Sequence, residues 1–170
     1  MRGRARAAAL AASLVVGGVL MGGCSGSDAS PEEAAADTES SRASVEDAVR
    51  SVAGVAAGVD LELGPLRGEW SVCTAEPPSL QYGAGGSGRP DGSMADQIAA
   101  LTDALEADGW TVENAGTEPR AYAVLVRDDL RATLGESRRH PGQVDAGVAG
   151  PCVDTTPEQD DLLTETYDIE

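Results

Sequence analysis

Apolar residues recur at the spacing of an α-helix in two segments of the chain. In the first, they follow Ser44, which suits a helix N-cap, and Gly58 suits the end of the helix. In the second, Ser93 is the expected N-cap of a helix over residues 94–108, and Gly109 follows it. The apolar faces consist of Val45, Val49, Val52, Ala56 and Val59 in the first expected helix, and of Met94, Ile98, Leu101 and Leu105 in the second.

Six further segments alternate between apolar and polar residues, a period that is typical of half-buried strands. The unbroken apolar run over residues 121–126 predicts the most buried of these strands. The elements follow in the order helix, two strands, helix and about four strands. We therefore predict an α+β fold, a two-layer sandwich in which two helices cover one face of an antiparallel sheet of about five to six strands. The expected strands are 69–74, 79–82, 110–114, 120–127, 130–134 and 144–148.

A short helix is expected near the C-terminus. Thr156 suits its N-cap, Pro157 its first position and Gln159 the third position of a capping box. The acidic residues from Asp160 onward form a tail that is expected to fray.

The N-terminus has the composition of a targeting segment. Arg2, Arg4 and Arg6 precede an uncharged stretch over residues 7–21 that is rich in Ala, Leu and Val. This stretch is shorter than the about 20 apolar residues that a membrane-spanning helix needs. It fits the hydrophobic region of a secretory signal peptide.

The sequence that ends this stretch, Leu20-Met21-Gly22-Gly23-Cys24, resembles the lipobox of bacterial lipoproteins. Met21 stands where Leu is usual in that family. The resemblance implies that the thiol of Cys24 receives a diacylglycerol group and that residues 1–23 are removed as a signal peptide. Two or three acyl chains anchor a protein stably, so the expected location is the cell membrane, on its extracytoplasmic side. An ordinary signal peptide that is cleaved nearby is the alternative.

Residues 25–43 contain mainly Ser, Ala, Gly and acidic residues, and no large apolar residue. Such a segment buries too little surface to offset its conformational entropy, so we expect it to be disordered. The predicted organisation is therefore a signal peptide over 1–23, a lipidated Cys with a disordered acidic tether over 24–43, and one α+β domain with an acidic tail over 44–170.

The charge of the chain restricts its partners. Twelve basic residues, all of them Arg, stand against 29 Asp and Glu, and the formal net charge is −17. Nucleic-acid binding is not expected, because contacts with phosphates need a basic face. Attraction to anionic lipids through a polybasic patch is not expected either. Membrane association is therefore expected to depend on the lipid at Cys24.

The three cysteines support the lipoprotein hypothesis. An odd cysteine in an exported protein needs an explanation, and lipidation of Cys24 leaves Cys73 and Cys152 as a pair. A disulfide between them is expected in an oxidising compartment, and two free buried thiols are the alternative. A zinc site is less expected, because two Cys and the distant His140 do not provide four ligands.

The segments around these cysteines carry a second resemblance. Trp70-Ser-Val-Cys73, Asp108-Gly109-Trp110 and Gly150-Pro151-Cys152 are similar to segments of small secreted lipoproteins that are common in actinobacteria. The similarity covers roughly residues 68–153. It implies a location and a single α+β domain with one Cys pair, but no particular chemistry.

Candidate catalytic motifs are weak. Gly83-Ala-Gly85-Gly86-Ser-Gly88 matches G-x-G-x-x-G, but residues 89–92 separate it from the next helix, so we interpret residues 83–92 as a flexible surface loop. His140 follows Arg138 and Arg139, and these three residues form a local group of positive charge. We expect a solvated loop here, and contact with an acidic partner is the alternative. Adjacent acids such as Asp128-Asp129 point in different directions. No catalytic residue, metal site or cofactor is assigned.

The sequence thus favours a monomeric, lipid-anchored, non-enzymatic accessory or binding module at the cell envelope. The expected partners are the membrane, through the lipid on Cys24, and an envelope protein or small ligand that the sequence does not identify. One alternative is a carrier that holds a small apolar or lipidic ligand between helix and sheet. A minor hydrolase is less favoured.

The anchor can be tested by removing its attachment atom. The Cys24→Ala variant should appear in the soluble or secreted fraction, because no acyl chain then holds the chain to the bilayer. Immunoblots of fractionated cells measure this, with Ser25→Ala as the matched control that should stay in the membrane fraction. A Cys24→Ala variant that stays with the membranes would refute lipid anchoring.

Overall fold

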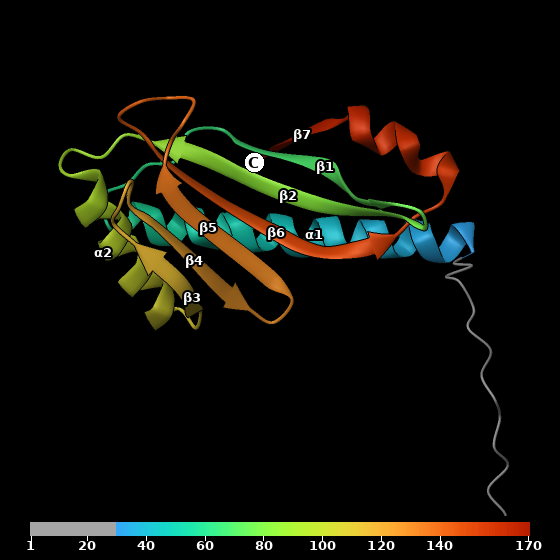
Figure 1. Ribbon diagram of the computed structural model, residues 1–170, viewed down its shortest axis with the longest axis horizontal. Coiled ribbons are helices and arrows are strands. Elements are labelled where there is room, and N and C mark those ends of the chain that lie inside the picture. Colours follow the sequence, from blue (N-terminus) through green and yellow to red (C-terminus); the bar gives the residue numbers. More distant parts are fainter. Residues whose placement is uncertain (1–29) are drawn as a thin grey trace, which may run out of the picture.

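Seven antiparallel strands form one sheet, in the order β3-β4-β5-β6-β2-β1-β7. The computed structural model describes residues 30–170, and α1 and α2 pack against the same face of the sheet (Figure 1). The helices are α1 (Pro31–Ala57), α2 (Met94–Ala107) and the 3-10 helix η1 (Pro157–Thr164). The strands are β1 (Leu66–Ala75), β2 (Pro78–Gly88), β3 (Thr111–Gly116), β4 (Tyr122–Arg127), β5 (Leu130–Glu136), β6 (Val144–Asp154) and β7 (Thr166–Ile169).

The α+β class and the antiparallel sheet are confirmed, and the predicted number of strands is slightly low. β7 was not expected, because the sequence there suggests a fraying tail. It pairs with β1, from Leu66 opposite Ile169 to Glu69 opposite Thr166, and forms an edge of the sheet. The short helix before it is confirmed as η1, in which the Thr156 N–H donates to Oε1 of Gln159 at 3.0 Å.

The expected start of the first helix was wrong, and with it the expected disorder of residues 31–43. α1 begins at Pro31, and Ser30 forms a capping box with Glu33. The side chains of Ala34, Thr38 and Ser41 continue the buried stripe of the helix toward its N-terminus. Gln159 of η1 covers this end, and its Nε2 donates to the Ala34 carbonyl at 3.3 Å. These residues are small or polar, so the apolar pattern does not detect them.

The interpretation of residues 83–92 as a flexible loop was wrong for its first part, because Gly83–Gly88 belong to β2. Residues 61–64, which follow α1, cross close to this end of the strand. A Cβ on Gly88 would lie 2.5 Å from the Glu62 carbonyl oxygen, and one on Gly86 would lie 3.1 Å from that of Gly64. Glycine is needed where two backbones approach in this way. The glycines of this segment are therefore explained by its close packing against the backbone of residues 61–64.

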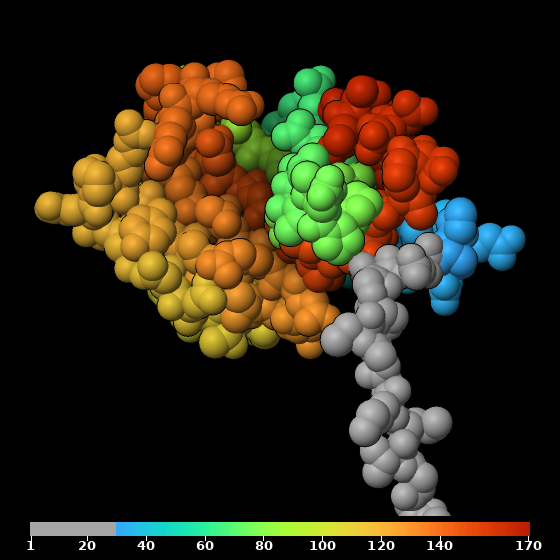
Figure 2. Space-filling view, turned by 45° about the vertical axis from the view of Figure 1, so that its right-hand side comes forward, coloured from blue at the N-terminus to red at the C-terminus, as the bar shows by residue number. Residues whose placement is uncertain are grey.

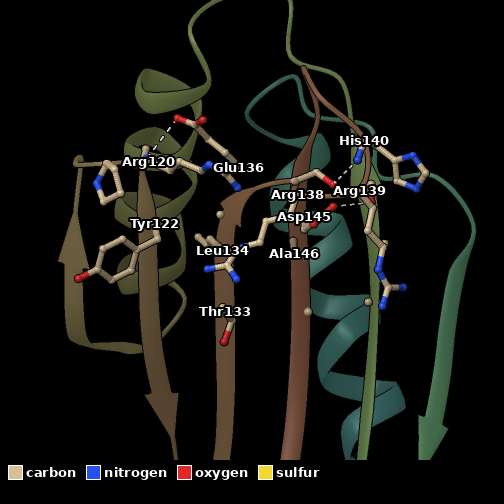
Figure 3. A pocket seen from close by; sticks show the side chains of 18 residues that line it. Arg120, Tyr122, Thr133, Leu134, Glu136, Arg138, Arg139, His140, Asp145 and Ala146 are labelled. Carbon is tan, nitrogen blue, oxygen red and sulfur yellow. Dashed lines mark hydrogen bonds between the residues drawn. The ribbon is translucent and has the colours of Figure 1, made fainter.

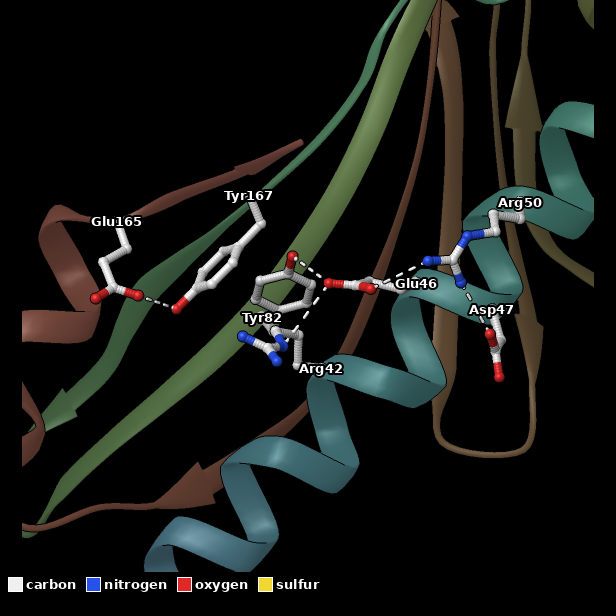
Figure 4. Close-up of polar contacts among 7 residues, drawn as sticks. All are labelled: Arg42, Glu46, Asp47, Arg50, Tyr82, Glu165 and Tyr167. Carbon is white, nitrogen blue, oxygen red and sulfur yellow. Dashed lines mark hydrogen bonds and ion pairs between the residues drawn. The ribbon is translucent and has the colours of Figure 1, made fainter. Parts of the chain in front are cut away.

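One buried tyrosine connects α1 to the sheet. Tyr82 of β2 is fully buried, and its hydroxyl donates to Oε1 of Glu46 on α1 at 3.2 Å (Figure 4). Burial, with the nearby Glu46 carboxylate as a further cause, raises the pKa of Tyr82 above its ordinary value. Its ring lies 5.1 Å from that of Trp70, between centroids, and Arg42 stacks on the ring of Tyr167. These contacts connect α1 to β2 and β7.

The predicted disulfide is present. Cys73 of β1 and Cys152 of β6 are bonded, and so the two strands on either side of β2 are joined covalently. Cys152 lies opposite Gln81, near the beginning of β2. The cysteines are 79 residues apart in the sequence, so the bond restricts a long loop in the unfolded chain.

Removal of this restriction should lower the stability of the domain. The double variant Cys73→Ala/Cys152→Ala should lose about 4.5 kcal/mol of unfolding free energy, the loop-entropy value for a closed loop of this length. Urea denaturation at equilibrium measures the loss, with the oxidised native chain as reference. Equal midpoints for the variant and the native chain would show that the bond does not stabilise the fold.

Candidate functional site

An open hollow of about 1270 Å³ lies on the face of the sheet that carries no helix. On β6, Val144, Ala146 and Val148 are buried toward the helices, and Asp145 and Gly147 alternate with them and point to the other face. The hollow is bordered by β2, β4, β5 and β6 near the loops that precede β4 and follow β5. The molecular surface is hollowed between the orange segments on one side and the green and red segments on the other (Figure 2).

The floor of the hollow is backbone rather than side chain. Gly85 and Gly86 of β2, Gly135 of β5 and Gly147 of β6 line it. Gly85 and Gly147 lie opposite each other in the pairing of β2 with β6. Because Gly85, Gly135 and Gly147 carry no Cβ, the sheet leaves room above them, whereas a Cβ on Gly86 would point to Leu66 and Gly64 on the other face. Thr133 of β5 adds an exposed hydroxyl to this surface.

One rim of the hollow is the loop between β5 and β6, which is held by its own hydrogen bonds. The N–H of buried Ser137 donates to the Gln143 carbonyl at 2.8 Å, and the Gln143 N–H donates to the His140 carbonyl at 3.1 Å. The His140 N–H donates to Oγ of Ser137 at 3.0 Å. The loop therefore presents the exposed side chains of Arg138, Arg139 and His140 from an ordered backbone (Figure 3).

The other rim comes from the segment that precedes β4. Pro119 and Arg120 line the hollow there, and Arg120 is exposed. The ring of Tyr122 lies over Gly116 of the edge strand β3, where a Cβ would come within 2.8 Å of the ring. Its hydroxyl donates to Oδ1 of Asn114 at 3.4 Å. Arg120 thus stands across the hollow from the loop that carries Arg138 and Arg139, whereas the ring of Tyr122 is turned toward β3 (Figure 3).

Two carboxylates also line the hollow, and both accept hydrogen bonds from neighbouring groups. Oδ1 of Asp145 accepts from the Ser87 hydroxyl at 2.6 Å. Oε1 of Glu136 accepts from the Ala121 N–H at 3.2 Å. Each of these bonds connects two neighbouring strands or their ends. The carboxylates therefore hold the wall of the hollow together.

The residues that sequence reasoning singled out have different positions. Arg138, Arg139 and His140 lie on the rim of the hollow, whereas Cys73 and Cys152 form the disulfide at the other end of β2. The signal peptide over 1–23 and the lipid attachment residue Cys24 lie outside the described residues. Sequence reasoning missed Arg120 and the glycine floor, and only the G-x-G-x-x-G segment gave a signal for the floor.

Among residues 30–170, no group of three or more His, Cys, Asp or Glu residues is placed to hold a metal ion. No helix of this described region combines the length and the apolar character that crossing a membrane requires.

Comparison with known proteins gives one match. A family model described as "Putative lipoprotein LppJ" matches residues 36–170, well over half of the chain. No curated protein and no solved structure matches the chain significantly.

Two glycines of the floor should respond differently to a side chain. A Cβ on Gly85 would lie 2.6 Å from the Ala146 carbonyl oxygen and 2.9 Å from Cα of Gly147, whereas the nearest atoms to one on Gly135 are at 3.8 Å. Gly85→Ala should therefore cost about 1–3 kcal/mol of unfolding free energy through overpacking, and Gly135→Ala less than about 0.5 kcal/mol. Chemical denaturation of both variants measures the difference. Equal losses would contradict the close approach of β2 and β6.

Proposed function

The chain belongs to the LppJ lipoprotein family, and from this premise we propose that it is a lipid-anchored, non-enzymatic binding module at the cell envelope. Its anchor is the lipid on Cys24, it faces the extracytoplasmic side of the membrane, and its ligand site is the hollow over β2, β4, β5 and β6. The family description supports the lipoprotein part of the proposal. The hollow supports the binding part.

The observation that carries this function is the hollow itself, about 1270 Å³ in volume. Its size is sufficient for a small ligand, since ligand pockets usually measure about 300–1,000 Å³. Its floor is a rigid sheet, and its rims are loops with exposed polar side chains, a combination that is common in binding sites. We also propose that the protein is a monomer and that a single chain forms the whole site.

The hollow favours a binding module over a carrier of apolar ligands. A carrier would hold its ligand between α2 and the sheet, where Leu101, Leu105 and Leu125 are fully buried and belong to one apolar core. The hollow lies on the opposite face and has a polar rim. Its shape and chemistry therefore suit a ligand that approaches from water.

A minor hydrolase is the second candidate, and one observation favours it. His140, Glu136 and Asp145 line the same hollow, and imidazole and carboxylate groups are common acid–base catalysts. The hydrogen bonds of Glu136 and Asp145 to Ala121 and Ser87 support structural roles for these carboxylates instead. We therefore place the hydrolase second.

Site-specific photo-crosslinking in cells tests the site of binding. A photoreactive amino acid at Thr133, on the exposed floor, should give a defined mass adduct in cells that produce the lipidated protein. The same group at Asp103, on the exposed side of α2, is the matched control and should give none. Gly135→Leu should abolish the adduct at position 133, because the new side chain projects into the hollow from a position where a Cβ meets no atom closer than 3.8 Å. Equal labelling at both positions, no adduct at position 133, or an adduct that persists in Gly135→Leu would contradict the proposed site.

A further inference from the structure

We infer that the hollow recognises an oxyanion, the phosphate or carboxylate group of a water-soluble or wall-borne ligand, through Arg120, Arg138 and Arg139. This inference rests on the proposed function, because it names the ligand class of the same site. It depends on three observations: the ion pairing of the arginines, the arrangement of the rims, and the position of the hollow along α1.

The arginines of the described region fall into two groups. Arg42, Arg50, Arg67, Arg127 and Arg131 each form an ion pair with Asp or Glu. Within residues 30–170, Arg89, Arg120, Arg138 and Arg139 form none. Three of these four line the hollow, and Nη1 of Arg89 lies beside Gly142 in the loop that forms its rim. In a chain with 29 acidic residues, the arginines of the described region that have no acidic partner are therefore gathered at one site.

The chemistry of these side chains selects an oxyanion. A guanidinium is planar, permanently charged and able to donate two parallel hydrogen bonds to one carboxylate or phosphate. Arg120 stands on one rim, and Arg138 and Arg139 stand on the other, so donors approach the hollow from two sides. The hydrogen-bonded backbone of the loop over residues 137–143 reduces the ordering cost of binding.

The carboxylates of the hollow do not neutralise these arginines in the structure. Glu136 and Asp145 accept their hydrogen bonds from Ala121 and Ser87. Three guanidinium groups and two carboxylates line the hollow, so its charge is opposite in sign to the net charge of −17. An anion is therefore the ligand that this site complements.

The position of the hollow argues against a phospholipid of the anchoring membrane as the ligand. Gln159 and Pro78 lie at the end of the molecule where α1 begins, whereas Ser87 accepts a hydrogen bond from Gly64, after the end of α1. α1 has 27 residues and spans about 40 Å. The segment from Cys24 to Pro31 reaches at most about 25 Å. With α1 upright on the bilayer and its first turn next to the anchor, the hollow therefore lies at the end of the molecule that is far from the membrane.

Ligand-observed NMR on the lipidated full chain in a nonionic detergent tests the inference. The probes are glucose 6-phosphate and glucuronate, which carry an oxyanion, and glucose, which does not. We expect both anionic probes to bind at concentrations up to about 10 mM and glucose not to bind. Binding of glucose with equal affinity, or no binding of either anionic probe in this range, would overturn the inference.

Charge-matched variants assign the binding to the hollow. Arg138→Gln/Arg139→Gln should weaken binding of glucose 6-phosphate at least about ten-fold, which corresponds to about 1.4 kcal/mol. Arg50→Gln/Arg67→Gln removes the same charge from α1 and β1 and should change the affinity less than about two-fold. Equal weakening in both double variants would show that only the total charge matters, and would overturn the site.

Two further arms separate the possible failures. The first uses the Cys24→Ala chain, which lacks the lipid. We expect it to bind phosphatidylglycerol vesicles no better than phosphatidylcholine vesicles. If it prefers phosphatidylglycerol, and if Arg138→Gln/Arg139→Gln abolishes that preference, the ligand is a lipid headgroup and the inference is contradicted.

The second uses the in-cell adduct at Thr133, which should also disappear in Arg138→Gln/Arg139→Gln. If that adduct persists, the hollow binds a ligand but not through these arginines. If no adduct forms in any variant, the proposed function fails as well.

Discussion

The close approach of backbone segments around β2 is the constraint on which the other features depend. Near its C-terminal end this strand pairs with β6 and is crossed by residues 61–64. The neighbouring segments lie so close that no side chain fits at Gly85, Gly86 or Gly88. The approach directs the chain from α1 into β1 and sets the position of α1 over β2 and β6. On the opposite face, the close pairing of Gly85 with Gly147 of β6 leaves the sheet without side chains at this place. The floor of the hollow is thus a consequence of the close pairing of β2 with β6.

The sequence predicts those elements whose apolar residues repeat. The α2 stripe of Ile98, Leu101 and Leu105 is buried as expected, and the alternation of β5 and β6 identifies their buried faces. The unbroken apolar run predicts β4 as the most buried strand, but within β4 only Ala123 and Leu125 are buried. The first turns of α1 escape prediction because their burial depends on contact with η1, more than 100 residues later. The glycines of β2 escape it because backbone packing leaves no apolar signal. The hollow was predictable only in part: the Arg138-Arg139-His140 segment is visible as an isolated positive spot, but only the fold brings Arg120 opposite to it.

The acidic surface and the cationic hollow act over different distances. At physiological ionic strength, charges separated by more than about 8 Å are largely screened, so most of the 29 acidic residues contribute little inside the hollow. They do oppose the approach of an anion at long range. The ligand must therefore be held by short, directional hydrogen bonds rather than by the field of the whole molecule, and guanidinium groups on an ordered loop provide such bonds.

The two ends of β2 are stabilised in different ways. Near its beginning, the disulfide joins β1 to β6, and the contacts of Gln159 and Thr155 close the same end. Near its end, the loop over residues 137–143 and the pairing of β2 with β6 are held by hydrogen bonds, among them that from Ser87 to Asp145. Local opening should therefore be easier at the hollow than at the disulfide, since hydrogen bonds can break there without the breaking of a covalent bond. An anchor at Cys24 would attach the membrane to the covalently closed end and leave the more adaptable end facing away from it.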